Sequence, residues 1–116
     1  IKSGKGNKGD VLQVANLAAI SAGKHTGNLI PLCHVLSEAS FNVDVLIDET
    51  TPGVVVQAEV NAFGQTGLEM EALTAVTVGL LTVYDMAKSL DRGMVIEGIR
   101  LILKDGGKSG QWSADI

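Results

Sequence analysis

The residues best suited to acid–base chemistry are Asp85 and Lys88, which stand three positions apart in a long apolar segment. This spacing places two side chains on one face of a helix. Glu71 lies fourteen residues before Asp85, so at 3.6 residues per turn it has nearly the same azimuth. A lysine in a desolvated site loses its proton more easily, and a nearby aspartate can orient it or move a proton. Spacing alone favours the plainer alternative, an ion pair on a solvated helix end.

Two glycine-rich segments carry lysines and resemble phosphate-binding motifs. Residues 4–9 read G-x-G-x-x-G before a predicted helix, but they lack the preceding strand and the later acidic residue of a dinucleotide fingerprint. A lysine-bearing loop that leads into a helix N-terminus can still bind phosphate. The alternative is that residues 4–9 form a loop without a binding role. Residues 107–109 resemble the end of a P-loop, but Ile102 stands where that motif requires glycine, so we reject a P-loop here.

Cys33 and His34 form the only adjacent cysteine–histidine pair. Neighbours in an extended segment point to opposite sides, so neither side chain readily activates the other. The alternative to a functional pair is a buried cysteine beside a histidine on the surface. Together with His25 they lack the ligand spacing of a zinc site, so we expect no metal.

Periodicity predicts the elements that must position these residues. We expect a first helix over residues 10–22, with Asp10 as its N-cap and Gly23 as its end. A polar connection over 25–29 and a hairpin of strands 41–48 and 54–62 should follow. A second helix over 69–91 and a last strand over 95–103 complete the predicted order. The uncharged stretch 72–84 predicts a helix covered on several sides, with Ala75 and Gly79 as points of close approach. The order α-β-β-α-β is that of a ferredoxin-like β-α-β-β-α-β unit without its first strand.

Composition limits the class of protein. A chain of 116 residues with 46% apolar and 19% charged residues is predicted to form a single globular domain over residues 1–116. One cysteine suits a reducing compartment, and a net charge of −4 argues against a general nucleic-acid binder. That charge is uneven, because residues 38–71 hold seven acidic and no basic side chains. The apolar stretch is shorter than the roughly 20 residues that cross a bilayer, so we expect no membrane partner.

Five motifs stand in an order typical of one family. They are Lys-Gly-Asp at 8–10, Leu-Ile-Pro-Leu-Cys-His at 29–34, Thr-Gly-Leu-Glu-Met-Glu-Ala-Leu-Thr at 66–74, Tyr-Asp-Met-Ala-Lys at 84–88 and Gly-Gly-Lys-Ser-Gly at 106–110. Together they resemble the cyclic pyranopterin monophosphate synthase (molybdenum cofactor biosynthesis protein C) family over nearly the whole chain.

This resemblance implies a lyase of molybdenum cofactor biosynthesis. Such an enzyme converts 3′,8-cyclo-7,8-dihydro-GTP to cyclic pyranopterin monophosphate and releases pyrophosphate, without a cofactor. The resemblance also implies an α+β ferredoxin-like fold, with two helices on one face of an antiparallel sheet. The expected assembly is a homo-hexamer, a trimer of dimers with active sites between subunits, in the cytoplasm or in the mitochondrion of a eukaryote. The alternatives are a non-catalytic oligomer that binds purine-nucleotide phosphates and a purely structural module.

The motifs also assign roles to individual residues. By resemblance, Asp85, Lys88 and Lys8 are catalytic. The substrate-binding residues would be Leu32, Cys33, His34, Glu69, Met70, Glu71, Lys24 and Lys104. Three positions depart from the family pattern: Gln65 for a basic residue, Val35 for proline and Ala87 for cysteine. The family extends further at its N-terminus, where the first strand would lie.

Overall fold

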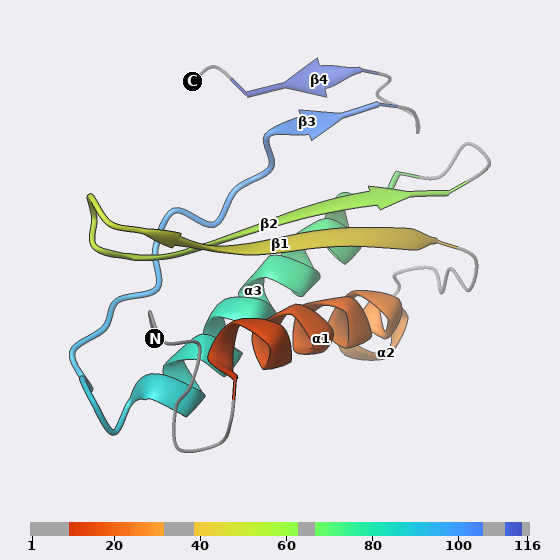
Figure 1. Cartoon of the computed structure of the whole chain (residues 1–116). Helices are drawn as coiled ribbons and strands as arrows, with labels where there is room; N and C mark the ends of the chain where they lie inside the picture. The colour runs from red at the N-terminus through yellow and green to blue at the C-terminus, as the bar shows by residue number, and fades with distance from the viewer. Residues whose placement is uncertain (1–9, 32–38, 63–66, 106–110, 115–116) are drawn as a thin grey trace.

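The computed structural model describes residues 10–31, 39–62, 67–105 and 111–114. Its elements in chain order are α1 (Val11–Lys24), α2 (Thr26–Leu29), β1 (Ser40–Asp48), β2 (Gly53–Asn61), α3 (Glu69–Ala87), β3 (Leu103–Lys104) and β4 (Trp112–Ser113). The two long helices lie side by side on one face of the β1–β2 hairpin (Figure 1). This is the predicted α+β arrangement of a ferredoxin-like unit, with no strand ahead of α1 in the described part of the chain.

Helix α1 begins at the predicted cap. The Asp10 carboxylate accepts hydrogen bonds from the backbone N–H groups of Leu12 and Gln13, at 3.1 and 3.2 Å. The prediction that Gly23 ends the helix is wrong, because α1 continues to Lys24. Gly23 is buried inside the helix, where a Cβ atom would collide with the ring of Phe41. This position requires glycine because of its small size, and not because of its conformational freedom.

The connection after α1 is more ordered than the sequence indicates. In place of the polar connection expected over residues 25–29, the chain forms the short helix α2. Thr26 fixes its start, because its buried hydroxyl donates a hydrogen bond of 2.8 Å to the carbonyl of Gly23. The segment is therefore tied to the end of α1 through a side chain.

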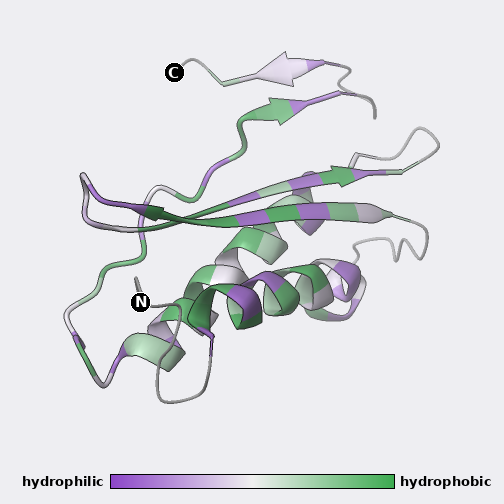
Figure 2. Ribbon diagram, viewed as in Figure 1, coloured by the Kyte–Doolittle hydropathy of each residue, from purple (hydrophilic) through white to green (hydrophobic). Residues whose placement is uncertain are grey.

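The hairpin confirms the predicted alternation of apolar and polar residues. β1 and β2 are antiparallel, and Val43 pairs with Ala58 and Val45 with Val56 on the face that meets the helices. Figure 2 shows the alternation as bands along both strands. The side-chain amide of Asn16 donates a 2.6 Å hydrogen bond to the carbonyl of Val43, which ties α1 to the hairpin.

Helix α3 packs against both α1 and β2, so it is covered on more than one side, as the uncharged stretch predicts. A Cβ atom on Gly79 would lie 3.3 Å both from the Cβ of Ala19 and from a methyl group of Val56. Gly79 is therefore a point where both neighbours approach α3 closely. The helix is long and apolar enough to cross a membrane, but here it forms the core against α1 and the hairpin. It ends at Ala87, four residues before the predicted end at 91.

The predicted last strand is only partly present. Residues 95–102 are in no ladder, and only Leu103–Lys104 forms a strand, which pairs with Trp112–Ser113. A strand needs a hydrogen-bonding neighbour, and β2 pairs only with β1 among the described residues. Gly98 also has a φ of 69°, which interrupts the pleat in the middle of the segment.

Replacing Gly79 with valine should destabilise the fold, because the added side chain must displace Ala19 or Val56. We expect a loss of about 1–3 kcal/mol in the free energy of unfolding, typical of an overfilled core. Urea denaturation measures it. Ser21→Val on the exposed face of α1 is the control, and should cost less than about 1 kcal/mol through helix propensity alone. Equal stability of Gly79→Val and the unaltered chain would contradict this packing.

The turn after β1 should make stability depend on pH. The Thr51 hydroxyl and the Thr50 backbone N–H donate to Asp48 at 2.6 and 3.0 Å, and these bonds lower the pKa of its carboxyl below 3.8. The unfolded chain therefore binds this proton more readily, so the contribution to stability is full above the unfolded pKa and is lost as pH falls through the folded one.

Thr51→Ala should accordingly lose stability less steeply than the unaltered chain when pH falls from about 5 to about 2. Thermal unfolding at several pH values measures the difference. Thr50→Ala is the matched control, since it keeps the backbone donor of Thr50. Parallel pH profiles for the unaltered chain and Thr51→Ala would show that the hydroxyl does not stabilise the ionised carboxyl.

Candidate functional site

The predicted pair of Asp85 and Lys88 is present at the end of α3. The Nζ of Lys88 lies 2.7 Å from Oδ1 of Asp85 and donates a hydrogen bond to it. The neighbouring residues Met86 and Ala87 are buried in the core. Their burial fixes the orientation of this last turn and leaves the acid–base pair on the outer side of the helix.

The electrostatic setting of this pair is that of a partly hydrated helix end. The side chains of Lys88 and Asp85 are 40% and 49% exposed, so a single chain does not desolvate them. A cation at the C-terminal end of a helix is favoured by the helix dipole, whereas a carboxylate there is not. Lys88 therefore offsets the unfavourable position of Asp85. Tyr84, one residue earlier, donates a 2.9 Å hydrogen bond to the carbonyl of Arg92 and holds the chain that follows.

A second group of predicted site residues gathers at the other end of α3. The Nζ of Lys104 in β3 lies 4.0 Å from a carboxylate oxygen of Glu69, the first residue of the helix. Only 10% of the Lys104 side chain is exposed. A Cβ atom on Gly67 would collide with the Glu69 carboxylate and approach Lys104 to 3.3 Å, so this glycine leaves room for both. Tertiary structure thus brings together two charges that are far apart in sequence.

The other predicted residues of this end differ in exposure. Met70 is half-exposed, whereas Glu71 is only 4% exposed. Glu71 and Asp85 therefore have different surroundings despite their similar azimuth. Lys24 is exposed at the C-terminal end of α1. Because Val11 at the start of α1 packs with Val83 near the end of α3, the helices are antiparallel, and Lys24 lies toward the Glu69 end.

The two groups are far apart within one chain. Sixteen residues of α3 separate Glu69 from Asp85, which is about 24 Å at the rise of an α-helix. The described residues therefore do not bring all the predicted site residues into one place. The helix that supports both groups also holds them apart.

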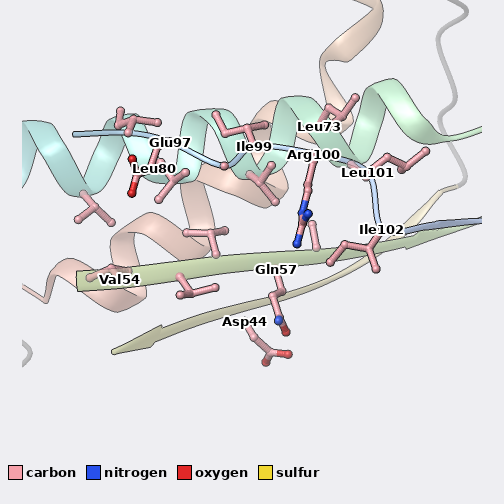
Figure 3. Close-up of a pocket in the computed structure, with 18 of the residues that line it drawn as sticks. Asp44, Val54, Gln57, Leu73, Leu80, Glu97, Ile99, Arg100, Leu101 and Ile102 are labelled. Carbon is pink, nitrogen blue, oxygen red and sulfur yellow. The ribbon is translucent and has the colours of Figure 1, made fainter. Parts of the chain in front are cut away.

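A groove is lined by β2, by the chain segment of residues 94–105 and by one side of α3 (Figure 3). Its volume is about 1620 Å³, and Glu69 and Lys104 belong to its lining. Arg100 and Glu97 add charge to a wall that is otherwise mainly apolar. Asp85 and Lys88 do not line it. No motif in the sequence singles out the residues of this groove, because its two walls are far apart in the chain.

Several predicted site residues lie outside the described part of the chain. They are Lys8, Leu32, Cys33 and His34, together with the departures Val35 and Gln65. The third departure, Ala87, is 2% exposed and belongs to the core behind the acid–base pair. Within residues 10–31, 39–62, 67–105 and 111–114, no three His, Cys, Asp or Glu side chains are grouped so that they could hold a metal ion.

The family resemblance predicted from the sequence is confirmed by comparison with family models. The MoaC family model matches residues 1–107, a range that contains both charged groups of α3 and all five motifs except the last three residues of the fifth. This match covers more than half of the chain. The protein therefore belongs to the MoaC family, which acts in molybdenum cofactor biosynthesis.

Proposed function

We propose that the protein is a lyase that converts 3′,8-cyclo-7,8-dihydro-GTP to cyclic pyranopterin monophosphate and releases pyrophosphate. Membership of the MoaC family supports the pathway. The observation that carries the chemistry is the hydrogen bond of 2.7 Å between Lys88 and Asp85 at the end of α3. A neighbouring acid and base can take a proton from a bound substrate and return one to it, and such proton transfers are the steps that this rearrangement repeats.

Acid–base chemistry would proceed at the Asp85–Lys88 pair. Opening of the purine ring and closure of the pterin both require protons to leave and join ring atoms. Asp85 would accept a proton from the substrate and Lys88 would deliver one, while their hydrogen bond keeps both groups oriented. Binding of substrate and closure by a neighbouring subunit would exclude water from a pair that is half-exposed in a single chain.

Phosphate chemistry would depend on lysines. Attack of a substrate hydroxyl oxygen on the nearest phosphorus forms the cyclic phosphate, and the bond from that phosphorus to the pyrophosphate oxygen breaks. Charge then develops on the departing pyrophosphate, and cations stabilise it. Lys104 supports this role because it is already partly desolvated beside Glu69, and Lys24 is exposed toward the same end of the molecule. Lys8 and His34 would complete the site by resemblance.

The separation of the two groups supports active sites between subunits. Groups that act on one substrate must lie within contact distance of it, and about 24 Å along a rigid helix does not permit this for all of them. We propose a homo-hexamer, a trimer of dimers, in which Asp85 and Lys88 of one chain meet Glu69 and Lys104 of another. Each chain would be a single domain that acts in the cytoplasm, or in the mitochondrion of a eukaryote, without a cofactor.

A second candidate is a non-catalytic oligomer that binds purine-nucleotide phosphates. The hydration of Asp85 and Lys88 in a single chain favours it, as does the replacement of the usual cysteine by Ala87 between them. The substrate separates the two functions. Binding of the cyclised GTP derivative without pyrophosphate release by the unaltered protein would favour this second function over the lyase.

Replacing either member of the acid–base pair should abolish product formation. We expect Asp85→Asn and Lys88→Ala to lower the rate of pyrophosphate release from the cyclised GTP derivative by about 10²–10⁴-fold, the usual contribution of general acid–base catalysis. Asp91→Asn, which changes an exposed carboxylate just beyond the same helix, should retain activity. Sedimentation would verify that the assembly is unchanged. Full turnover in both pair variants would exclude these residues from catalysis.

Mixing two inactive variants should restore activity if the sites lie between subunits. Asp85→Asn and Lys104→Ala chains are unfolded together and reassembled at equal amounts. Roughly a quarter of the sites between chains would then contain both an unaltered Asp85 and an unaltered Lys104. Pyrophosphate release should recover to about that fraction. Each variant reassembled alone is the control. If mixed oligomers form and stay inactive, the two groups do not share a site across an interface.

A further inference from the structure

The chain changes direction directly after the acid–base pair, in a turn over residues 88–93 (Figure 1). Helix α3 ends at Ala87, and Lys88 is its C-cap, with a φ of −61° and a ψ of −24°. The backbone N–H groups of Leu90 and Asp91 both donate to the carbonyl of Ala87, at 2.9 and 3.3 Å. These bonds satisfy one of the carbonyls that a helix end leaves without an intrahelical partner. Lys88 is therefore the first residue of a turn that closes on the end of the helix.

Two side chains fix the far end of this turn. The hydroxyl of Tyr84 donates a hydrogen bond of 2.9 Å to the backbone carbonyl of Arg92, eight residues later. The carboxylate of Asp91 accepts a hydrogen bond of 2.9 Å from the backbone N–H of Gly93. Aspartate often closes a turn in this way, by bonding to the backbone two residues further on. The bond from Tyr84 reaches from the body of α3 to the end of the turn, so it spans Lys88.

The two members of the acid–base pair are held in different ways. Asp85 lies inside α3, where the buried side chains of Met86 and Ala87 fix the helix around it. Lys88 lies beyond the last helical residue, so its backbone is fixed by Ala87 on one side and by the turn on the other. The direction in which its ammonium group meets Asp85 therefore depends on the turn as well as on the helix.

We propose that Tyr84 is a positioning residue, which holds Lys88 against Asp85 by fixing the turn of residues 88–93. This inference rests on the proposed function, because it takes the pair as the site of proton transfer. Loss of the hydroxyl would loosen the turn and leave α3, with Asp85 inside it, in place. Proton transfer requires heavy atoms within about 2.6–3.2 Å of each other, so even a small displacement of Lys88 slows the reaction.

Tyr84→Phe tests the structural part of the proposal, because it removes the hydroxyl and keeps the ring. Amide hydrogen exchange in the assembled protein should become about fivefold faster at Leu90 and Asp91, as expected for the loss of one hydrogen bond. The amides within α3 should keep their protection, which shows that the variant is folded. Arg92→Ala is the matched control. It keeps the backbone carbonyl that the hydroxyl contacts, so exchange in the turn should stay unchanged.

The rate of pyrophosphate release from the cyclised GTP derivative tests the catalytic part. Tyr84→Phe should lower kcat by about tenfold or more and leave KM within about twofold, because the lysines proposed to bind phosphate lie elsewhere. Arg92→Ala should retain both values. In a Lys88→Ala background, Tyr84→Phe should cost less than about twofold in kcat, because a residue that acts through Lys88 then has nothing to position.

Each part of the proposal can fail separately. Unchanged exchange at Leu90 and Asp91 in Tyr84→Phe would show that the hydroxyl does not fix the turn. Faster exchange with an unchanged kcat would show that the turn does not position Lys88 for the reaction. An equal loss of kcat with and without Lys88 would show that Tyr84 acts on another group.

Failure of the lyase proposal itself gives a different result. The unaltered protein would then release no pyrophosphate, and the catalytic part of the inference would fall with the proposed function. The exchange measurement needs no turnover, so it would still decide whether Tyr84 fixes the turn after α3.

Discussion

The close packing of α3 at Gly79 is the constraint on which the rest of the structure depends. At this position α1 approaches through Ala19 and β2 through Val56, each 3.3 Å from where a Cβ atom would be. A glycine inside a helix costs about 1 kcal/mol relative to alanine. Here the close contacts of α3 with α1 and with β2 offset this cost. Both charged groups stand on the ends of the helix that this contact immobilises.

The rigid helix α3 fixes the positions of the two charged groups but holds them far apart. Asp85 and Lys88 are fixed by the buried residues beside them, and Glu69 is fixed near Lys104 by the start of the same helix. The distance between the groups follows from helix geometry and does not close through side-chain motion. The proposed active site between chains would use both ends of this helix. Oligomerisation would then be part of the chemistry, and not only of stability.

The uneven charge of the chain has a similar spatial explanation. The net charge of −4 argues against anionic ligands only if charges are averaged. The acidic side chains of the hairpin, such as Asp44 and Glu59, lie on its exposed positions, away from the core. Lys104, in contrast, is partly desolvated beside Glu69 at the start of α3, where charges interact more strongly than in bulk water. Placement, and not the sum, decides what the surface can bind.

The sequence by itself determined the local features and the family. Capping by Asp10, the alternation of the hairpin and the spacing of Asp85 and Lys88 depend on neighbours in the chain, and five ordered motifs indicated the MoaC family. Tertiary structure alone decided three things. Gly23 faces Phe41 and does not end its helix. Residues 95–102 pair with no strand in the described part of the chain. Lys104 meets Glu69 beside a groove. Each depends on contacts between segments distant in sequence, and local patterns carry no information about such contacts.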